Sequence, residues 1–256
     1  MTTTTSRHFA GFFFISKFRM LSIMTRPKNK SYIIGIDEVG RGPLAGPVVV
    51  CAVAIPYSCT PTSILKHLPL RDSKKLTPTA RALWATAIAH DSRIFHSIAS
   101  TSPSTIDRIN ITQATNRAAT RALTKLLATL PSPSRVAVFL DGGLFVNPQN
   151  SKFEIRNLKS NTKQKYRSRF HNSKADTHID LKIETVIKGD ETIPAISLAS
   201  IVAKEHRDTR MRRAHKKYPY YGFDRHVGYG TKMHLAAIRE NGHSPLHRKS
   251  FLKKIY

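Results

Sequence analysis

Four acidic residues of this sequence stand at the ends of segments whose apolar, β-branched composition predicts buried strands. They are Asp37 and Glu38 after residues 32–36, Asp141 after residues 135–140, and Asp190 after residues 181–188. The chain has only 16 acids among 256 residues, so a solvated surface would not ordinarily gather four in such places. Carboxylates that converge at one sheet edge repel one another unless divalent cations neutralise them, and oxygen-only ligation favours Mg²⁺ or Mn²⁺ over zinc. Two such ions can activate water against a phosphodiester.

Asp37 and Glu38 are adjacent, and neighbouring residues of a regular strand face opposite ways. They can serve one site only if the strand ends or bulges there. A glycine-rich turn follows at once, in which Gly40, Gly42 and Gly46 bracket Arg41. Its backbone can approach a ligand closely and present N–H groups to a phosphate.

The charge of the chain favours a polyanionic partner. The formal net charge is +26 and the pI is about 10.5, which points to nucleic acid. A non-catalytic basic nucleic-acid-binding protein is therefore an alternative to an enzyme. That alternative explains the charge but gives no reason for acids at three strand ends.

The order of expected elements indicates an α/β domain with a mixed sheet flanked by helices and a helical C-terminal part. The expected strands are 32–36, 48–55, 93–99, 135–140 and 181–188. The expected helices start near Thr77–Pro78 and span 110–130, 196–217 and 232–241, with Gly242 after the last one.

Two segments fall outside this order. Residues 1–30 are basic and lack acids, and we expect a disordered leader before a single domain at 31–256. A transit peptide, a poor secretion signal, or a true start at Met20 or Met24 are the alternatives. The polar, basic segment at about 146–179 is expected to be a flexible insertion, or else an added grip on phosphates with Tyr166 and Phe170 for stacking.

Other kinds of site are set aside. The two cysteines, Cys51 and Cys59, are too few for a disulfide framework, and Pro245 interrupts the spacing of His243 and His247 as zinc ligands. No nucleophile turn and no Walker-type phosphate loop occurs in the sequence. No stretch reaches the length of a transmembrane helix, so no membrane partner is expected.

Several motifs, in their order along the chain, resemble those of the ribonuclease HII family. They are the IDEVGRG segment at 36–42, DSKKL at 72–76, LDG at 140–142, KGD at 188–190, SIVAK with RD at 200–208, GYGTK with His234 at 228–234, and the HR–SF ending at 247–251. Together they span residues 32 to 251, apart from the 146–179 segment.

The resemblance implies an RNase H-like fold and an endonuclease that cuts RNA in RNA–DNA hybrids and 5′ of single ribonucleotides in duplex DNA, leaving 3′-hydroxyl and 5′-phosphate ends. It implies Mn²⁺ or Mg²⁺ as cofactor, a monomer, and a cytoplasmic location. Asp37, Glu38, Asp141 and Asp190 fall on the four catalytic and metal-binding positions of the family. The substrate-binding positions match Gly40, Arg41, Gly42, Lys74, Lys204 and Tyr229, with Arg207 as a further candidate for a phosphate contact.

Some matches leave alternatives. Asp208 is the rival of Asp190 as the fourth acid and is ranked second because it lies well inside an expected helix. The spacing between Asp141 and Asp190 is longer than the family pattern, and Leu198 stands where a small residue is common. Within the enzyme class the related type-three ribonuclease H is the alternative, but Arg41 and the short stretch before Tyr32 favour type two.

Overall fold

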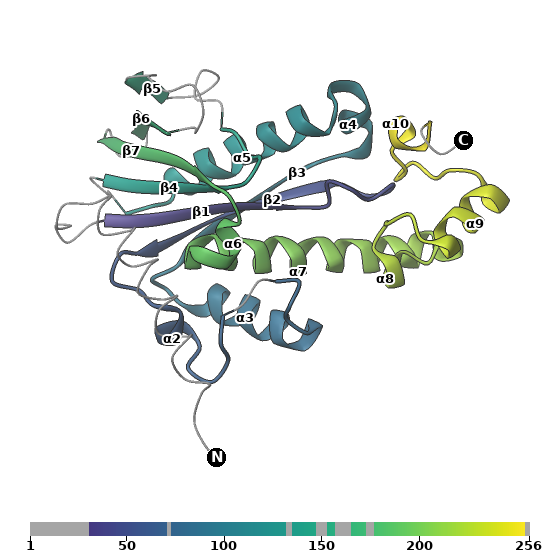
Figure 1. Ribbon diagram of the computed structural model, residues 1–256, viewed down its shortest axis with the longest axis horizontal. Helices are drawn as coiled ribbons and strands as arrows, with labels where there is room; N and C mark the ends of the chain where they lie inside the picture. The colour runs from purple at the N-terminus through teal and green to yellow at the C-terminus, as the bar shows by residue number, and fades with distance from the viewer. Residues whose placement is uncertain are drawn as a thin grey trace, which may run out of the picture.

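The structure is a computed structural model that describes residues 31–70, 73–131, 135–146, 153–156, 165–172 and 177–253. The expected leader at 1–30 lies outside the described residues. Within them the chain forms a mixed sheet with helices on both faces and a run of short helices at one end (Figure 1). This architecture agrees with the α/β class expected from the sequence.

The sheet has seven strands in the order β3-β2-β1-β4-β7-β6-β5. They are β1 (Ser31–Val39), β2 (Val48–Pro56), β3 (Phe95–Thr101), β4 (Arg135–Asp141), β5 (Phe153–Arg156), β6 (Lys165–Asn172) and β7 (Thr177–Val186). The three central strands β1, β4 and β7 run parallel, and the outer neighbours pair antiparallel on both sides. Because carboxyl ends of parallel strands lie at one edge, the topology brings the ends of β1, β4 and β7 together.

Five longer helices of the described residues accompany the sheet. They are α3 (Pro78–His90), α4 (Pro103–Ile109), α5 (Ile111–Leu127), α7 (Pro194–Lys217) and α9 (Lys232–Asn241). Of these, α5 and α7 pack directly on the strands of the sheet. Short turns complete the chain: α2 (Pro61–Ile64), α6 (Gly189–Thr192), η2 (Pro219–Tyr221), α8 (Phe223–His226) and α10 (Lys249–Leu252). Helix α5 lies on one face, whereas α7 lies on the other with α3 beside it (Figure 1).

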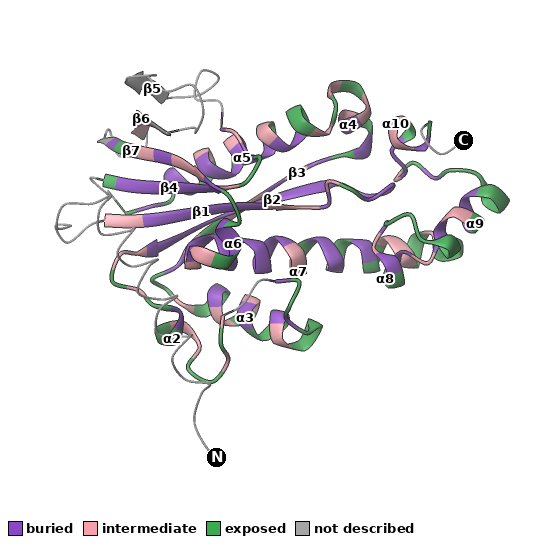
Figure 2. Ribbon diagram, in the orientation of Figure 1, coloured by how far each residue is buried: buried purple, intermediate pink, exposed green. Residues whose placement is uncertain are grey.

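Two apolar cores follow from this layering. Alternate residues of β1, Ile34 and Ile36, pack with the alanine and leucine stripe of α5, and Ile33 packs with α7 and Trp84 of α3. The central strands are buried on both sides (Figure 2), which explains their continuous apolar composition. Gly35 is needed where β1 meets α7, because a Cβ there would lie 2.1 Å from the carbonyl carbon of Ala195. Leu198 is fully buried in the second core, so its size is accommodated.

The 146–179 segment contributes strands to the sheet. Strand β6 pairs antiparallel with β7 along residues 165–172, and β5 pairs with β6. Phe170 of β6 is buried in the core beside β7 and is therefore not placed for base stacking, unlike the expectation for it. The long spacing between Asp141 and Asp190 is taken up by these strands, while β4 and β7 remain direct neighbours.

None of the helices in the described part of the chain combines the length and the apolar character needed to cross a membrane.

Candidate active site

The expected acids meet at the carboxyl end of the central parallel strands. The pairing of β1 with β4 ends at Ile36 and Leu140, so Asp37 and Asp141 are the next residues of two neighbouring strands. On the other side, Asp141 is in register with Val186, the last residue of β7. The backbone N–H of Gly189 donates to Asp141 Oδ1 at 2.7 Å. These contacts join three segments that are far apart in the sequence.

The sequence suggested that Asp190 directly follows a strand, but in the structure it does not. Strand β7 ends at Val186, and Asp190 lies in the single turn of α6. Lys188 takes a left-handed conformation (φ 53°), which turns the chain back toward Asp141. The carbonyl of Asp190 accepts a hydrogen bond from Ser197 Oγ of α7, and its side chain is buried. The short helix still brings Asp190 beside the strand ends.

Asp37 and Glu38 occupy opposite faces of β1, and the strand pairs regularly with β2 through both of them. The expected strand end or bulge is therefore absent from this stretch. Asp37 lies on the α7 face, where Ser200 hydrogen-bonds its carboxylate. Glu38 lies toward Arg41, whose Nη1 is 3.5 Å from Glu38 Oε1. Both acids lie at the same edge because the pairing of β1 with β4 ends at Ile36, just before them.

The acids are close enough to influence one another electrostatically. Burial, and then the neighbouring charges of Glu38 and Asp141, raises the pKa of Asp37 well above its usual range, against the hydrogen bond from Ser200. Burial and Asp141 likewise raise the pKa of Glu38, although Arg41 opposes the shift. Three carboxylates with this mutual repulsion need positive charge to be ionised together.

The donor set fits hard divalent cations. Glu38 Oε2 is buried and has no hydrogen-bond partner among the described residues. A buried carboxylate oxygen ordinarily has a hydrogen-bond donor or a cation beside it, and a divalent cation would fill this role for Glu38. In the described ranges no three His, Cys, Asp or Glu side chains are gathered tightly enough to ligate an ion as they stand. Arg41 supplies the nearest positive charge to Glu38. All the candidate ligands are carboxylates, which suits Mg²⁺ or Mn²⁺.

The Gly40–Gly42 turn and Tyr229 lie beside the acids. A Cβ placed on Gly42 would be 3.8 Å from Tyr229 Cε1, so the turn and the ring face each other. Nη1 of Arg41 lies 3.6 Å from the position of a Cβ on Gly143, in the turn after Asp141. The ring of Tyr229 is half exposed, as a group that contacts substrate must be. The sequence-predicted turn, tyrosine and acids thus form one continuous surface.

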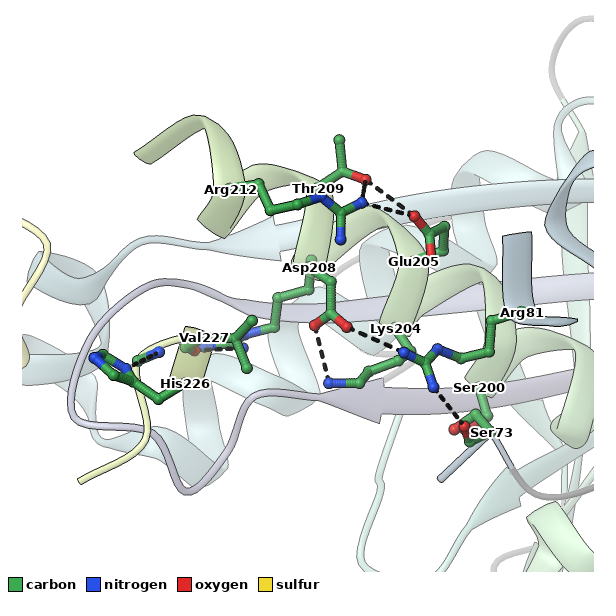
Figure 3. A network of polar contacts seen from close by, with 12 residues as sticks. Ser73, Arg81, Ser200, Lys204, Glu205, Asp208, Thr209, Arg212, His226 and Val227 are labelled. Atoms are coloured by element: carbon green, nitrogen blue, oxygen red, sulfur yellow. Dashed lines mark hydrogen bonds and ion pairs between the residues drawn. The ribbon is translucent and has the colours of Figure 1, made fainter. Parts of the chain in front are cut away.

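The expected phosphate-binding lysines have carboxylate neighbours. The exposed Lys74 has its Nζ 3.8 Å from Asp190 Oδ2. Lys204 Nζ lies 2.9 Å from Asp208 Oδ1, and Asp208 Oδ2 lies 3.7 Å from Arg81 Nη2. Figure 3 shows Lys204 and Arg81 both pointing toward Asp208. Asp208 is therefore enclosed by two cations on α7 and α3, away from the edge that holds the other acids.

The same network contains an arginine and two serines that sequence reasoning did not single out. Arg81 Nη1 donates to the carbonyls of Ser73 and Leu76, and Ser73 Oγ lies 2.8 Å from Ser200 Oγ (Figure 3). Ser200 in turn contacts Asp37. Both serines lie inside motifs that carried the resemblance, at positions 73 and 200, which was the available signal. They link the loop that carries Lys74 to the first acid.

The expectation that Arg207 contacts a phosphate is wrong. Its side chain is completely buried. It donates to the carbonyls of Pro47, Ala45 and Val227 at 3.1, 3.1 and 2.9 Å. No feature of the sequence distinguished this buried arginine from the many exposed ones.

Comparison with known proteins gives one consistent family. A family model described as "Ribonuclease HII" matches residues 34–254. The ribonuclease HII of Pelodictyon phaeoclathratiforme is 40% identical over 225 residues, which cover 88% of this chain and 91% of that protein. The ribonuclease HII of Chlamydia pneumoniae is 38% identical over 222 residues, 86% of this chain and 83% of that protein.

Solved structures share the fold. The crystal structure of ribonuclease H2 from Pyrococcus horikoshii matches with a TM-score of 0.58 and 22% identity, covering 88% of this chain and 96% of that one. A structure titled as Bst-RNase HIII in complex with Mn²⁺ matches with a TM-score of 0.56 and 20% identity, covering 88% and 69% of the two chains.

Proposed function

This chain belongs to the ribonuclease HII family and is an endonuclease of RNA–DNA hybrids, and we propose that it also cuts 5′ of single ribonucleotides in duplex DNA. The proposed products carry 3′-hydroxyl and 5′-phosphate ends. We also propose that it acts as a monomer in the cytoplasm, as the family resemblance implies. The observation that carries the proposal is the convergence of Asp37, Glu38 and Asp141 beside the Gly40–Gly42 turn.

Recognition of the ribonucleotide is proposed for the surface between the turn and Tyr229. The 2′-hydroxyl is the group that distinguishes RNA from DNA, and a backbone turn held against an aromatic ring can read it. Arg41 lies between this surface and Glu38, where it can contact a neighbouring phosphate. Lys74, exposed beside Asp190, is proposed as a second phosphate contact, and Lys204 as a weaker one.

The acids are proposed to hold the metal ions and thereby the reacting phosphate. Asp37, Glu38, Asp141 and Asp190 would hold two divalent cations, which supply an activated water and stabilise the leaving oxygen. Ser200 orients Asp37, and the N–H of Gly189 orients Asp141. Arg41 and Lys74 balance the acids in the free protein and can turn to the substrate phosphates when cations are bound.

The test uses a labelled DNA duplex that carries one ribonucleotide, incubated with Mg²⁺ or Mn²⁺. A single cut 5′ of the ribonucleotide is expected, and chelator should abolish it. Asp37→Asn should lower the cleavage rate by at least about 100-fold while duplex binding survives, because asparagine keeps the shape and loses the ligand charge.

An all-DNA duplex and a long RNA–DNA hybrid are the controls. Cleavage of the hybrid but not of the single-ribonucleotide duplex would restrict the activity to hybrids. Binding without cleavage of either substrate would instead support a non-catalytic nucleic-acid-binding protein.

A further inference from the structure

Two arginines, Arg207 of α7 and Arg248 just before α10, are completely buried beneath the glycine-rich segment 40–47. Neither forms an ion pair with a carboxylate in the described part of the chain. Both direct their guanidinium groups at backbone carbonyls instead. A buried cation without a carboxylate is costly, so these two side chains need an explanation beyond filling space.

Their hydrogen bonds converge on one segment. Arg248 donates to the carbonyls of Gly40, Arg41 and Gly46 at 2.6, 2.7 and 3.0 Å. Arg207 donates to those of Ala45 and Pro47, both at 3.1 Å. Two guanidinium forks thus bind five of the eight carbonyls between residues 40 and 47.

Arg207 also joins this segment to residues 227–231, the tyrosine loop that carries Tyr229 between α8 and α9. Arg207 Nη1 also donates to the carbonyl of Val227, two residues before Tyr229. The N–H groups of Leu44 and Ala45 both donate to the Gly228 carbonyl, and the N–H of Arg248 donates to the Leu44 carbonyl. Gly40 leaves room for the arrangement, because at its φ of 87° a Cβ would lie 2.2 Å from Arg207 Nε.

We propose that Arg207 and Arg248 are positioning residues that preorganise the Gly40–Gly42 turn against Tyr229, and so set the preference for a ribonucleotide. The inference rests on the proposed function, since it concerns the same recognition surface. The carbonyls of Gly40 and Arg41 are committed to the protein interior, which fixes the orientation of their peptide groups before substrate arrives. Preorganisation of this kind raises specificity by removing the ordering cost from binding.

Arginine-to-lysine substitutions distinguish the effect of the planar guanidinium fork from the effect of the positive charge. Lysine keeps the positive charge but cannot bind two carbonyls with a planar fork. Each substitution, Arg207→Lys and Arg248→Lys, is made in the Asp37→Asn background, and binding is measured to a duplex with one ribonucleotide and to the all-DNA duplex. We expect the ratio of the two affinities to fall by about tenfold or more. The exposed Arg213→Lys on α7 is the matched control and should leave the ratio unchanged.

A purely structural role would lower the melting temperature but leave the affinity ratio of the folded fraction intact, and that result would overturn the proposal. Because binding is read without cleavage, loss of the ratio is distinguishable from failure of the proposed reaction, which is tested on the wild-type protein.

Hydrogen exchange of the unsubstituted protein gives a test that needs no variant. The amides of Leu44, Ala45 and Gly46, which donate to backbone carbonyls, should be protected before substrate is added, and the all-DNA duplex should change that protection little. Free exchange of this segment until a ribonucleotide-containing duplex binds would contradict preorganisation.

Discussion

At the scale of single residues, the two glycines of the turn have opposite surroundings. A Cβ on Gly40 would collide with Arg207 and approach the Pro47 carbonyl to 2.9 Å, at a φ that disfavours side chains. A Cβ on Gly42 would meet only the Tyr229 ring, at an ordinary contact distance of 3.8 Å. One glycine is therefore required by the fold, and the other faces the proposed ribonucleotide site.

We predict that Gly42→Ala leaves stability nearly unchanged but lowers cleavage at a single ribonucleotide by about tenfold or more, because the methyl group occupies the gap that the sugar needs. Gly40→Ala should destabilise the protein by roughly 2 kcal/mol or more. Thermal melts and cleavage rates of both variants check this. Unfolding of Gly42→Ala, or full activity, would contradict the assignment.

The residue scale also shows what the sequence could predict about the site. The acids Asp37, Glu38 and Asp141 were found because a carboxylate after a buried strand is unusual in so basic a chain. The burial of Arg207 and Arg248 was not predictable, because 42 lysines and arginines offer no local signal for the two that lie inside. Their partners are backbone carbonyls, which every sequence has.

At the scale of elements, α6 and α7 present the two rival acids in different surroundings. Asp190 of α6 lies at the strand edge with the exposed Lys74 as its neighbour. Asp208 of α7 lies between Lys204 and the buried Arg81, which holds the carbonyls of Ser73 and Leu76. The first arrangement places the carboxylate at the strand edge beside an exposed cation, whereas the second uses the carboxylate in packing α3 against α7.

We predict that Asp190→Asn abolishes cleavage while changing the free energy of unfolding by less than about 1 kcal/mol, since its lysine partner is exposed and asparagine keeps the shape of the side chain. Asp208→Asn should cost roughly 3 kcal/mol, because it removes the carboxylate that the buried Arg81 faces. The cleavage rate of the Asp208→Asn variant should keep the wild-type dependence on divalent cation concentration. Urea unfolding and metal titrations separate the two effects, and the reverse pattern would make Asp208 the fourth acid.

Element prediction succeeded where the pattern was local. Local composition indicated the correct element in three places. They are the alanine and leucine stripe of α5, the Thr77–Pro78 start of α3 and the apolar run of β2. Strands β5 and β6 were missed because they are polar and depend on pairing with β7 rather than on their own composition. The break between β7 and α6 was also missed, because it depends on the left-handed Lys188, an uncommon conformation for that residue type.

At the scale of the whole molecule, the C-terminal helices form a module that supports the tyrosine loop. Their core contains Tyr221 and Phe223. Two buried histidines, His234 and His247, are in ring contact with Phe223. Asp107 of α4 anchors the module by accepting from the N–H groups of Lys249 and Ser250. The recognition surface thus depends on a contact between the C-terminal helices and α4.

The direction of the hydrogen bond between His234 and His247 follows from the other hydrogen bonds that the two rings make. The N–H of Ser244 donates to His247 Nδ1, so the proton of neutral His247 lies on Nε2. That Nε2–H donates to His234 Nε2 at 3.0 Å, and His234 Nδ1–H donates to the Tyr229 carbonyl at 2.8 Å. The chain of hydrogen bonds ends at the residue that faces the glycine turn, and it requires both rings to be neutral.

This requirement makes stability depend on pH. Burial lowers the pKa of both His234 and His247 to about 4, and in His247 the neighbouring His234 adds to the shift. At these two positions the unfolded chain, with histidine pKa values near 6.5, therefore binds more protons than the folded chain between pH 6.5 and 4. The stability that these two histidines contribute is fully present above pH 6.5 and is lost as the pH drops toward 4, by about 3 kcal/mol or more, while the raised pKa values of Asp37 and Glu38 act in the opposite direction.

Urea unfolding across this range measures the fall, and His247→Asn should make it shallower even though the variant is less stable at pH 7. The exposed His67→Gln, in the segment between α2 and α3, is the control and should keep the wild-type slope. Because the rings support the Tyr229 loop, the preference for a single ribonucleotide should weaken over the same pH interval, ahead of global unfolding. A slope that His247→Asn leaves unchanged would place the acid sensitivity elsewhere in the molecule and separate it from the tyrosine loop.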